Sequence, residues 1–263
     1  MGFETITLAI ADGIARLTLA RPDKLNALTS RMRQELLAAL DHIAGYEAAR
    51  VVILTGEGRG FCAGQDLDEA VGSGEADGPA DLGVPLDREY NPLIRRLARF
   101  PKPTLAAVNG VAAGAGANLA LVCDLVIAAR SAQFAQAFVR IGLIPDCGGT
   151  FVLPRLVGLQ RAMGLALTGE AIDAETAARW GLIWRAVEDA ALETETIMLA
   201  RRLAAGPSAV RLIRDALWGS LGNGLDAQLD LERDLQRRAG FTQDFAEGVA
   251  AFREKRAPRF EGR

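Results

Sequence analysis

The stretch TLAAVNGVAAGAGANLAL, residues 104–121, decides the fold class of this chain. Its first part, TLAAVNG, is a short apolar run that ends at a glycine, which is typical of a buried strand. The second part, GVAAGAGANLAL, supplies small residues and then an apolar helical pattern. The stretch therefore predicts a strand, a glycine-rich turn and the start of a helix. At a helix start the first backbone N–H groups lack partners within the helix and are available to a ligand oxygen.

A second turn of the same kind lies earlier in the chain. The apolar run VVILTG, residues 51–56, leads through FCAGQDL, residues 61–67. Two such N–H donors aimed at one oxygen would form an oxyanion hole, in which each donor stabilises a thioester enolate by about 3–4 kcal/mol. Taken singly, each turn reads more simply as a tight connection. The glycine spacing does not fit a dinucleotide-binding fingerprint, and the motif GxxxxGK[ST] is absent.

The segment LIPDCGGTFVLPRLVG, residues 143–158, contains an isolated carboxylate. Asp146 is the only acidic residue between Asp124 and Glu170. A carboxylate in apolar surroundings is partly desolvated, which raises its pKa and makes it a better base at neutral pH. The alternative at this point is that Asp146 only caps the helix that follows Gly148-Gly149.

Strand patterns alternate with helical patterns through residues 1–195, and a helical region follows over 196–263. This order predicts an α/β fold with a largely parallel core sheet. The predicted elements are a hairpin over 6–20 around Asp12-Gly13, a helix over 31–44 capped by Thr29 or Ser30, a surface loop over 68–88, a helix over 89–99, a strand over 124–129, mostly helix from 151, and an extended piece near 182–187.

Composition excludes several classes of function. The net charge of −3 gives no electrostatic basis for nucleic-acid binding. The single histidine, His42, lies in an amphipathic helical pattern away from the glycine turns, so a hydrolase with a histidine base is nearly excluded. Three cysteines without a Cys-x-x-Cys motif indicate neither a disulfide framework nor a zinc site. The sequence shows no signal peptide and no apolar run long enough for a membrane, so we expect a cytoplasmic protein.

Four segments in this order resemble the crotonase, or enoyl-CoA hydratase/isomerase, superfamily over essentially the whole chain. They are FCAGQDL, GVAAGAGANLALVCDLVIAARSAQF, IGLIPDCGG and the ending FTQDFAEGVAAFREKRAPRF. The resemblance implies a crotonase-like spiral core of repeated ββα units over residues 1–195. It also implies a C-terminal helical region, residues 196–263, that takes part in forming a homotrimer or a hexamer.

The resemblance also implies an acyl-CoA thioester as substrate, with coenzyme A as part of the substrate and no separate cofactor or metal. The thioester carbonyl would lie between the backbone N–H groups of Gln65 and Ala115. The loop RPDKLNAL, residues 21–28, resembles the segment that packs against CoA. The expected CoA or substrate contacts are Lys24, Ala27, Ala63, Asp66 and Leu67, with Phe241 and Lys255 reaching CoA in the same chain or across a subunit interface.

Two departures from the family pattern bear on the reaction. Hydratases of this family use two glutamates, and the corresponding positions here are Asn118 and Phe138. Neither side chain exchanges protons at neutral pH, so hydration by two carboxylates is improbable. Asp146 falls where several isomerases of the family carry a catalytic aspartate. We therefore expect an isomerase in which Asp146 is the acid and base, Asn118 orients substrate or water, and Phe138 lines an apolar pocket.

Within the superfamily the chain is most similar to isomerases of phenylacetate catabolism, which rearrange a ring epoxide of phenylacetyl-CoA to an oxepin and also shift double bonds in enoyl-CoA chains. Four alternatives remain open. They are a hydratase that uses Asp146 alone, an aryl-CoA dehalogenase with a similar aspartate, a non-catalytic scaffold that binds CoA or RNA, and a structural trimer with an inactive site. An aryl-CoA dehalogenase also needs a histidine near the ring, and His42, the single histidine, lies away from the glycine turns. The negative net charge argues against RNA binding.

Overall fold

The computed structural model describes residues 2–72 and 81–262, and the chain folds by repeating one unit of two strands and a helix. The first unit is the predicted hairpin, β1 (Ile6–Ala11) and β2 (Ile14–Leu19), followed by α1 (Ser30–Gly45). The Thr29 side chain accepts a hydrogen bond from the N–H of Met32 and so caps α1, as the sequence predicts.

In the three later units, one strand of each pair joins a large sheet and the other joins a small sheet. The units are β3 (Val51–Gly56), β4 (Gly60–Cys62) and α2 (Leu67–Gly72); β5 (Thr104–Val108), β6 (Val111–Ala113) and α5 (Ala115–Leu121); and β7 (Leu125–Ala129), β8 (Gln133–Ala135) and α6 (Gly149–Thr168). This arrangement confirms the predicted α/β spiral of ββα units.

The large sheet has the order β1-β2-β3-β5-β7-β10 and the small sheet the order β4-β6-β8-β9, with β9 at Ala171–Asp173 and β10 at Arg185–Val187. All pairs are parallel except β1 with β2 and β8 with β9. Every residue of β3 is buried, as expected for a parallel strand that is covered on both faces. Each glycine turn lies where the chain leaves the small sheet and enters a helix, from β4 to α2 and from β6 to α5.

The prediction of a surface loop over residues 68–88 is wrong at both ends. Helix α2 occupies Leu67–Gly72, a short turn α3 occupies Gly83–Pro85, and one wide helical turn, Leu86–Tyr90, leads directly into α4 (Asn91–Ala98). Tyr90 is fully buried and joins this segment to the core. The middle of the predicted loop, residues 73–80, lies outside the described residues.

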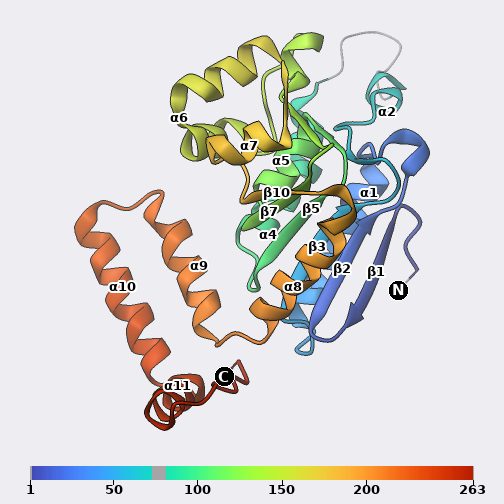
Figure 1. The fold of residues 1–263 in the computed structure, drawn as a ribbon. Helices are drawn as coiled ribbons and strands as arrows, with labels where there is room; N and C mark the ends of the chain where they lie inside the picture. The colour runs from blue at the N-terminus through green and yellow to red at the C-terminus, as the bar shows by residue number, and fades with distance from the viewer. Residues whose placement is uncertain (1, 73–80, 263) are drawn as a thin grey trace.

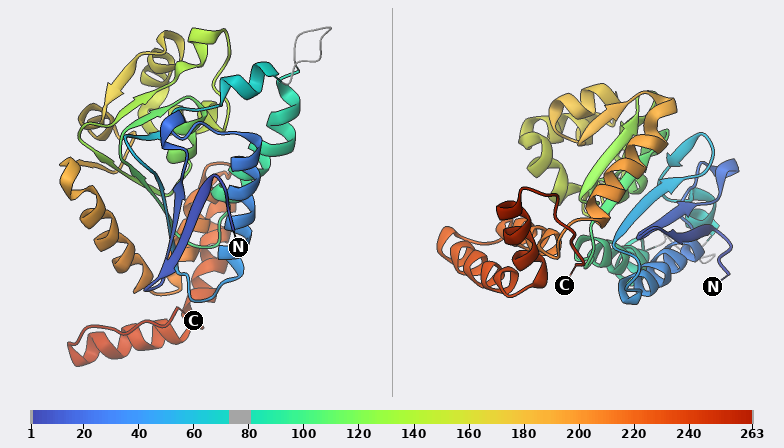
Figure 2. Two further views of the ribbon diagram at one scale, coloured as in Figure 1. Left: turned by 90° about the vertical axis from the view of Figure 1, so that its right-hand side faces the viewer. Right: turned by 60° about the horizontal axis from the view of Figure 1, so that its bottom comes forward.

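The C-terminal part is helical, with α7 (Ala174–Trp180), α8 (Leu192–Ala204), α9 (Ala209–Ser220), α10 (Leu225–Gly240) and α11 (Gln243–Glu254). Helix α8 packs on strands of the large sheet. Helices α9, α10 and α11 extend away from the core to one side, as Figure 1 and the right view of Figure 2 show. The domain boundary at residue 195, which α8 spans, stays a prediction.

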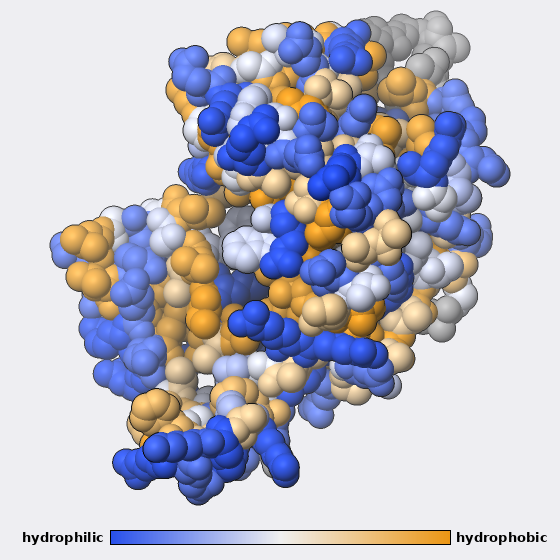
Figure 3. Space-filling model, viewed as in Figure 1, coloured by the Kyte–Doolittle hydropathy of each residue, from blue (hydrophilic) through white to orange (hydrophobic). Residues whose placement is uncertain are grey.

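The extended arm exposes apolar side chains. Figure 3 shows them over α9 and the start of α10, beside the hollow that separates these helices from the core. They include Ile213, Leu217, Leu221 and Leu225, which are between 39% and 75% exposed. No helix in the described part of the chain is both long enough and apolar enough to cross a membrane.

Candidate active site

The first glycine turn, FCAGQDL, is held against the loop that precedes α1. The N–H of Leu28 donates to the carbonyl of Gly64, and the N–H of Asp66 donates to the carbonyl of Leu28. This bridge uses the groups on either side of Gln65 and leaves the Gln65 N–H without a backbone acceptor among the described residues. One of the two predicted oxyanion donors is therefore available.

The second donor lies at the start of α5. Gly114, with a φ of 53°, precedes the helix, and its N–H donates to the carbonyl of Ala135. Ala115 is the first residue of α5, so its N–H has no acceptor within the helix, and it has no other backbone acceptor in the described part of the chain.

The two turns lie against each other, and this contact requires a glycine at position 64. Gly64 has a φ of 100°, and a methyl group placed on it would lie 2.9 Å from the Ala113 carbonyl oxygen and 3.6 Å from the Ala115 nitrogen. A side chain at position 64 would therefore push the turns apart. The sequence could predict each turn, but their contact comes from β4 and β6 pairing in the small sheet.

A buried arginine that the sequence analysis does not single out supports the first turn. Arg33 on α1 is 4% exposed and donates to the Leu28 carbonyl at 2.9 Å. It also donates to the Tyr90 hydroxyl and pairs with Glu89 at 2.6 Å, so its charge is compensated. The amphipathic pattern of α1 gave no signal for this role, because Arg33 contacts residues far away in the sequence.

Asp146 lies in the turn before α6, between Ala137–Ile141, a 3₁₀ helix, and Gly149. Its carboxylate does not cap α6, because the cap residue is Gly148 and no side chain caps that helix. The Oδ1 atom of Asp146 is buried and has no hydrogen-bond partner among the described residues. Burial raises the pKa of Asp146, and contact with the Cys147 thiol opposes this more weakly. The geometry thus favours a proton acceptor over a capping residue.

Asn118 lies on α5 and contacts Asp146 through the backbone. Its Nδ2 donates to the Asp146 carbonyl oxygen at 2.8 Å, and its Oδ1 accepts from Gln136 Nε2 at 2.8 Å. Asn118 is fully buried. The family resemblance predicts that Asn118 orients substrate or water, but in the structure both ends of its carboxamide form hydrogen bonds within the protein. Gln136 is a site residue that the sequence analysis missed.

Phe138 covers the second turn. It is 7% exposed, and its ring lies 3.7 Å from the position that a methyl group on Gly114 would take. It therefore packs against the backbone of the second turn at Gly114, and its role in lining a substrate pocket stays a prediction.

The residues expected to contact CoA lie together beside the first turn. Lys24 is exposed, and its Nζ lies 3.0 Å from Asp68 Oδ2. Arg21 pairs with Asp66 at 2.8 Å and donates to the Ala27 carbonyl at 2.6 Å. Burial acts to raise the pKa of Asp66, but the hydrogen bond and charge of Arg21, together with the backbone N–H groups of Glu69 and Asp68, outweigh it, so the pKa is lowered. Arg21 is a further residue that the sequence analysis did not single out.

Of the four other residues predicted to contact CoA, two lie beside the first turn and two do not. The N–H of Ala63 donates to the Leu25 carbonyl, and Leu67 at the start of α2 is 52% exposed. Phe241 follows α10 and Lys255 follows α11, and both are exposed. In Figure 1 the ends of these helices lie at the opposite end of the molecule from α2 and α5. Within one chain, the structure does not bring Phe241 and Lys255 to the glycine turns.

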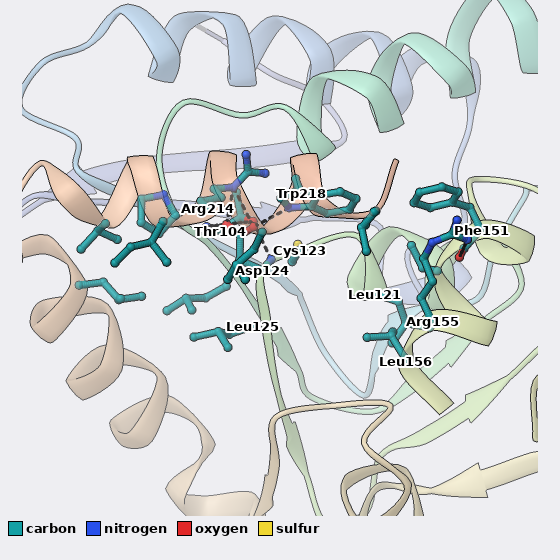
Figure 4. Close-up of a pocket in the computed structure, with 18 residues that line it drawn as sticks. Thr104, Leu121, Cys123, Asp124, Leu125, Phe151, Arg155, Leu156, Arg214 and Trp218 are labelled. Carbon is teal, nitrogen blue, oxygen red and sulfur yellow. Dashed lines mark hydrogen bonds and ion pairs between the residues drawn. The ribbon is translucent and has the colours of Figure 1, made fainter. Parts of the chain in front are cut away.

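A separate apolar cavity of about 440 Å³ lies between α9 and the core (Figure 4). Phe151 and Leu156 of α6 line one end, and Arg214 and Trp218 of α9 lie along the middle. Arg214 pairs with Asp124 at 2.7 Å. Neither Asp146 nor the two glycine turns line this cavity. Among the described residues no cluster of three or more His, Cys, Asp or Glu side chains could hold a metal ion.

Comparisons with known proteins point to one family. The family described as Enoyl-CoA hydratase/isomerase matches residues 9–263. The chain is 52% identical to the 1,2-epoxyphenylacetyl-CoA isomerase of Escherichia coli K12 over 262 residues, 99% of each chain. It is 53% identical to a probable enoyl-CoA hydratase of Rhodobacter capsulatus over 264 residues, 100% of each. A crystal structure of a putative enoyl-CoA hydratase from Streptomyces coelicolor A3(2) matches with a TM-score of 0.93 and 40% identity, covering 100% of this chain and 96% of that one.

Proposed function

Because the chain belongs to the enoyl-CoA hydratase/isomerase family, we propose that it is an acyl-CoA isomerase in which Asp146 is the acid and base. The single observation that carries this proposal is the buried carboxylate oxygen of Asp146, which has no partner in the described part of the chain. A buried acceptor without a partner is rare in folded proteins and calls for an explanation. A substrate proton would supply the missing partner.

Binding of the thioester is proposed to use the two backbone donors. The carbonyl oxygen lies between the N–H groups of Gln65 and Ala115, neither of which has a backbone acceptor among the described residues. Negative charge develops on this oxygen when a proton leaves the neighbouring carbon, and each fixed donor stabilises it by about 3–4 kcal/mol. Coenzyme A lies along Lys24, Ala27 and Ala63, with Asp66 and Leu67 at the start of α2.

The chemical step moves one proton. The Asp146 carboxylate takes a proton from one carbon of the acyl chain, which leaves an enolate conjugated with the double bond. The same carboxyl group then returns the proton to another carbon of that conjugated system, and the double bond moves. No water is consumed, and Asp146 ends ionised as it began. The raised pKa suits this role, since a base of very low pKa would hold the proton too weakly.

The acyl group is proposed to carry a ring or an unsaturated chain. The buried Phe138 ring beside Gly114 supports an apolar pocket at the reacting end. Similarity to the 1,2-epoxyphenylacetyl-CoA isomerase supports a ring epoxide of phenylacetyl-CoA as one substrate, rearranged to an oxepin. In that case Asp146 acts on the acidified carbon next to the thioester.

Hydration of an enoyl-CoA is the second candidate, and the similarity to the probable enoyl-CoA hydratase favours it. It requires a group to activate water and a group to deliver a proton. Asn118 is bonded to Asp146 and Gln136, and Phe138 carries no acid, so Asp146 would have to serve both roles. We therefore rank isomerisation first.

A panel of acyl-CoA thioesters tests the proposed function. A 3-enoyl-CoA, crotonyl-CoA and a ring epoxide of phenylacetyl-CoA are each incubated with the wild-type protein, and products are identified by mass and ultraviolet spectrum. The proposal expects shift of the 3-enoyl double bond and rearrangement of the epoxide, each at least about 10-fold faster than hydration of crotonyl-CoA. Hydration at a rate equal to isomerisation would favour the second candidate instead.

A further inference from the structure

We propose that Gln136 and Asn118 form a carboxamide relay that positions Asp146, with Gln136 as a positioning residue for the reaction. This inference rests on the proposed function, because it assumes that Asp146 is the acid and base. The relay is defined as the chain of hydrogen bonds from Gln136 Nε2 to Asn118 Oδ1 and from Asn118 Nδ2 to the Asp146 carbonyl oxygen.

Both bonds of the relay are 2.8 Å long and lie in the interior. Asn118 is 0% exposed and Gln136 is 3% exposed, so water does not compete for these groups. The three residues come from different elements, with Asn118 on α5, Gln136 after β8 and Asp146 before α6. The relay therefore ties the loop of Asp146 to the helix that begins at Ala115.

The direction of the relay follows from its last acceptor. A backbone carbonyl can only accept, so Asn118 must present its amide nitrogen to Asp146. The Oδ1 of Asn118 then faces Gln136, which must present its own amide nitrogen. The Gln136 Oε1 atom is buried and has no partner among the described residues. Gln136 therefore contributes to the relay through its amide nitrogen, as a donor.

Gly149 leaves room for the relay. Its N–H donates to the same Asp146 carbonyl oxygen at 2.8 Å. A methyl group placed on Gly149 would lie 2.3 Å from Asn118 Nδ2, too close for both to remain in place. The glycine at position 149 is therefore required by the side chain of Asn118, and not by its own backbone conformation, which is helical.

One short helix sets both halves of the proposed catalytic site. Ala115 begins α5 and supplies an oxyanion donor, and Asn118 lies one turn later with its N–H bonded to the Gly114 carbonyl. Asn118 thus fixes the distance between the base and the oxyanion donor. A shift of about 1 Å in such a distance can reduce turnover by about 100-fold without changing how substrate binds.

Steady-state kinetics of Gln136→Met and Gln136→Glu test the relay, because neither side chain touches CoA in the proposed site. The first variant removes the donor and keeps the size, and the second places a carboxylate against Asn118 Oδ1. We expect kcat for isomerisation to fall about 10- to 100-fold in both, with KM within about 2-fold of wild type. Thermal unfolding confirms that each variant is folded.

A pair of glycine variants in α6 supplies the matched control. Gly149→Ala displaces Asn118 and should show the same loss of kcat at nearly constant KM. Gly164→Ala lies in the same helix, where a methyl group meets nothing within 4 Å, and should keep wild-type kcat. If Gly149→Ala alone failed to fold, the two Gln136 variants would still decide the question.

The variant Asp146→Asn separates the failure of the relay from the failure of the proposed function. If Asp146→Asn is inactive while folded Gln136→Met and Gln136→Glu keep wild-type kcat, the relay is overturned and the proposed function stands. A change of KM in parallel with kcat in the Gln136 variants would also overturn it, since that indicates a role in binding. Wild-type turnover by Asp146→Asn would overturn both.

Discussion

One oxygen of the Asp146 carboxyl group is buried and has no hydrogen-bond partner in the part of the chain that the structure describes. Burial raises the pKa of this group above its ordinary value of 3.8. A base acts only in its ionised form, so activity falls as pH falls through the raised pKa. We predict that the acid limb of the kcat/KM profile for isomerisation has a midpoint above pH 3.8, measured from pH 4 to 9 in a constant-ionic-strength buffer. A rate that stays level down to pH 4 would argue against Asp146 as the base.

The same pKa has a consequence for stability. The folded-state pKa of Asp146 is raised above the unfolded value, so its favourable contribution is present below pH 3.8 and is lost as pH rises through the folded-state pKa. We predict that Asp146→Asn raises the melting temperature at pH 7 relative to wild type. A lower melting temperature at pH 7 would show that the carboxylate is paired instead.

Gly64 gives a second residue-scale prediction. Its φ of 100° and the 2.9 Å distance from a methyl position to the Ala113 carbonyl both oppose a side chain. We predict that Gly64→Ala destabilises the fold by about 1–3 kcal/mol, from backbone strain. It should also lower kcat/KM, because the two oxyanion turns move apart. Urea unfolding measures the first effect, and Gly45→Ala, where a methyl group meets nothing within 4 Å, is the control that should show neither.

Some of the site residues could be predicted from sequence and others could not. Asp146, Gln65 and Ala115 stand in segments with their own local signals, a lone carboxylate and two glycine turns. Gln136 has no local signal, because its role depends on Asn118, 18 residues earlier in the chain. The direction of the Asn118 carboxamide likewise depends on Asp146, which lies in another turn. Such contacts require the fold.

At the scale of elements, long periodic segments were predictable and very short ones were not. The hairpin, α1, β3, β5 and β7 agree with their predictions. The strands β6, β8 and β9 have three residues each, which is too few to show an alternating pattern. In the sequence, β6 falls among the small residues that predict the glycine-rich turn before α5. The segment 68–88 is rich in Gly, Asp and Pro, which are typical of loops. Its composition therefore does not predict α2 or the helical turn that leads into α4.

An ion pair between Arg214 and Asp124 helps to attach helix α9 to the core. Arg214 pairs with Asp124 at 2.7 Å and also donates to the carbonyls of Leu97 and Ala98. The two side chains are 6% and 17% exposed. We predict that Arg214→Met destabilises the protein by about 3 kcal/mol in urea unfolding, because it leaves the Asp124 carboxylate without its cationic partner. Arg211→Met on the same helix removes a pair with Asp215 at 3.9 Å, 54% and 37% exposed, and should cost less than about 1 kcal/mol. Equal effects of both variants would contradict this account of the attachment.

At the scale of the whole molecule, the arm of α9, α10 and α11 leaves apolar side chains uncovered in a single chain. Leu217 is 65% exposed and Leu225 is 75% exposed. We predict that the protein sediments at three or six times the 27.9 kDa of one chain, and that Leu217→Glu shifts it toward lower mass. A wild-type protein that sediments as a single chain would refute the trimer or hexamer and any reach of Phe241 or Lys255 to a neighbour's CoA.

The central claim is that Asp146 carries the proton, and the most direct test is turnover of a 3-enoyl-CoA by Asp146→Asn. Asparagine keeps the size of the side chain but cannot accept a proton at neutral pH. With folding confirmed and acyl-CoA affinity unchanged, we predict that kcat falls by about 100- to 10,000-fold, the range for loss of a general acid–base group. A folded Asp146→Asn variant with kcat within a few-fold of wild type would contradict the account.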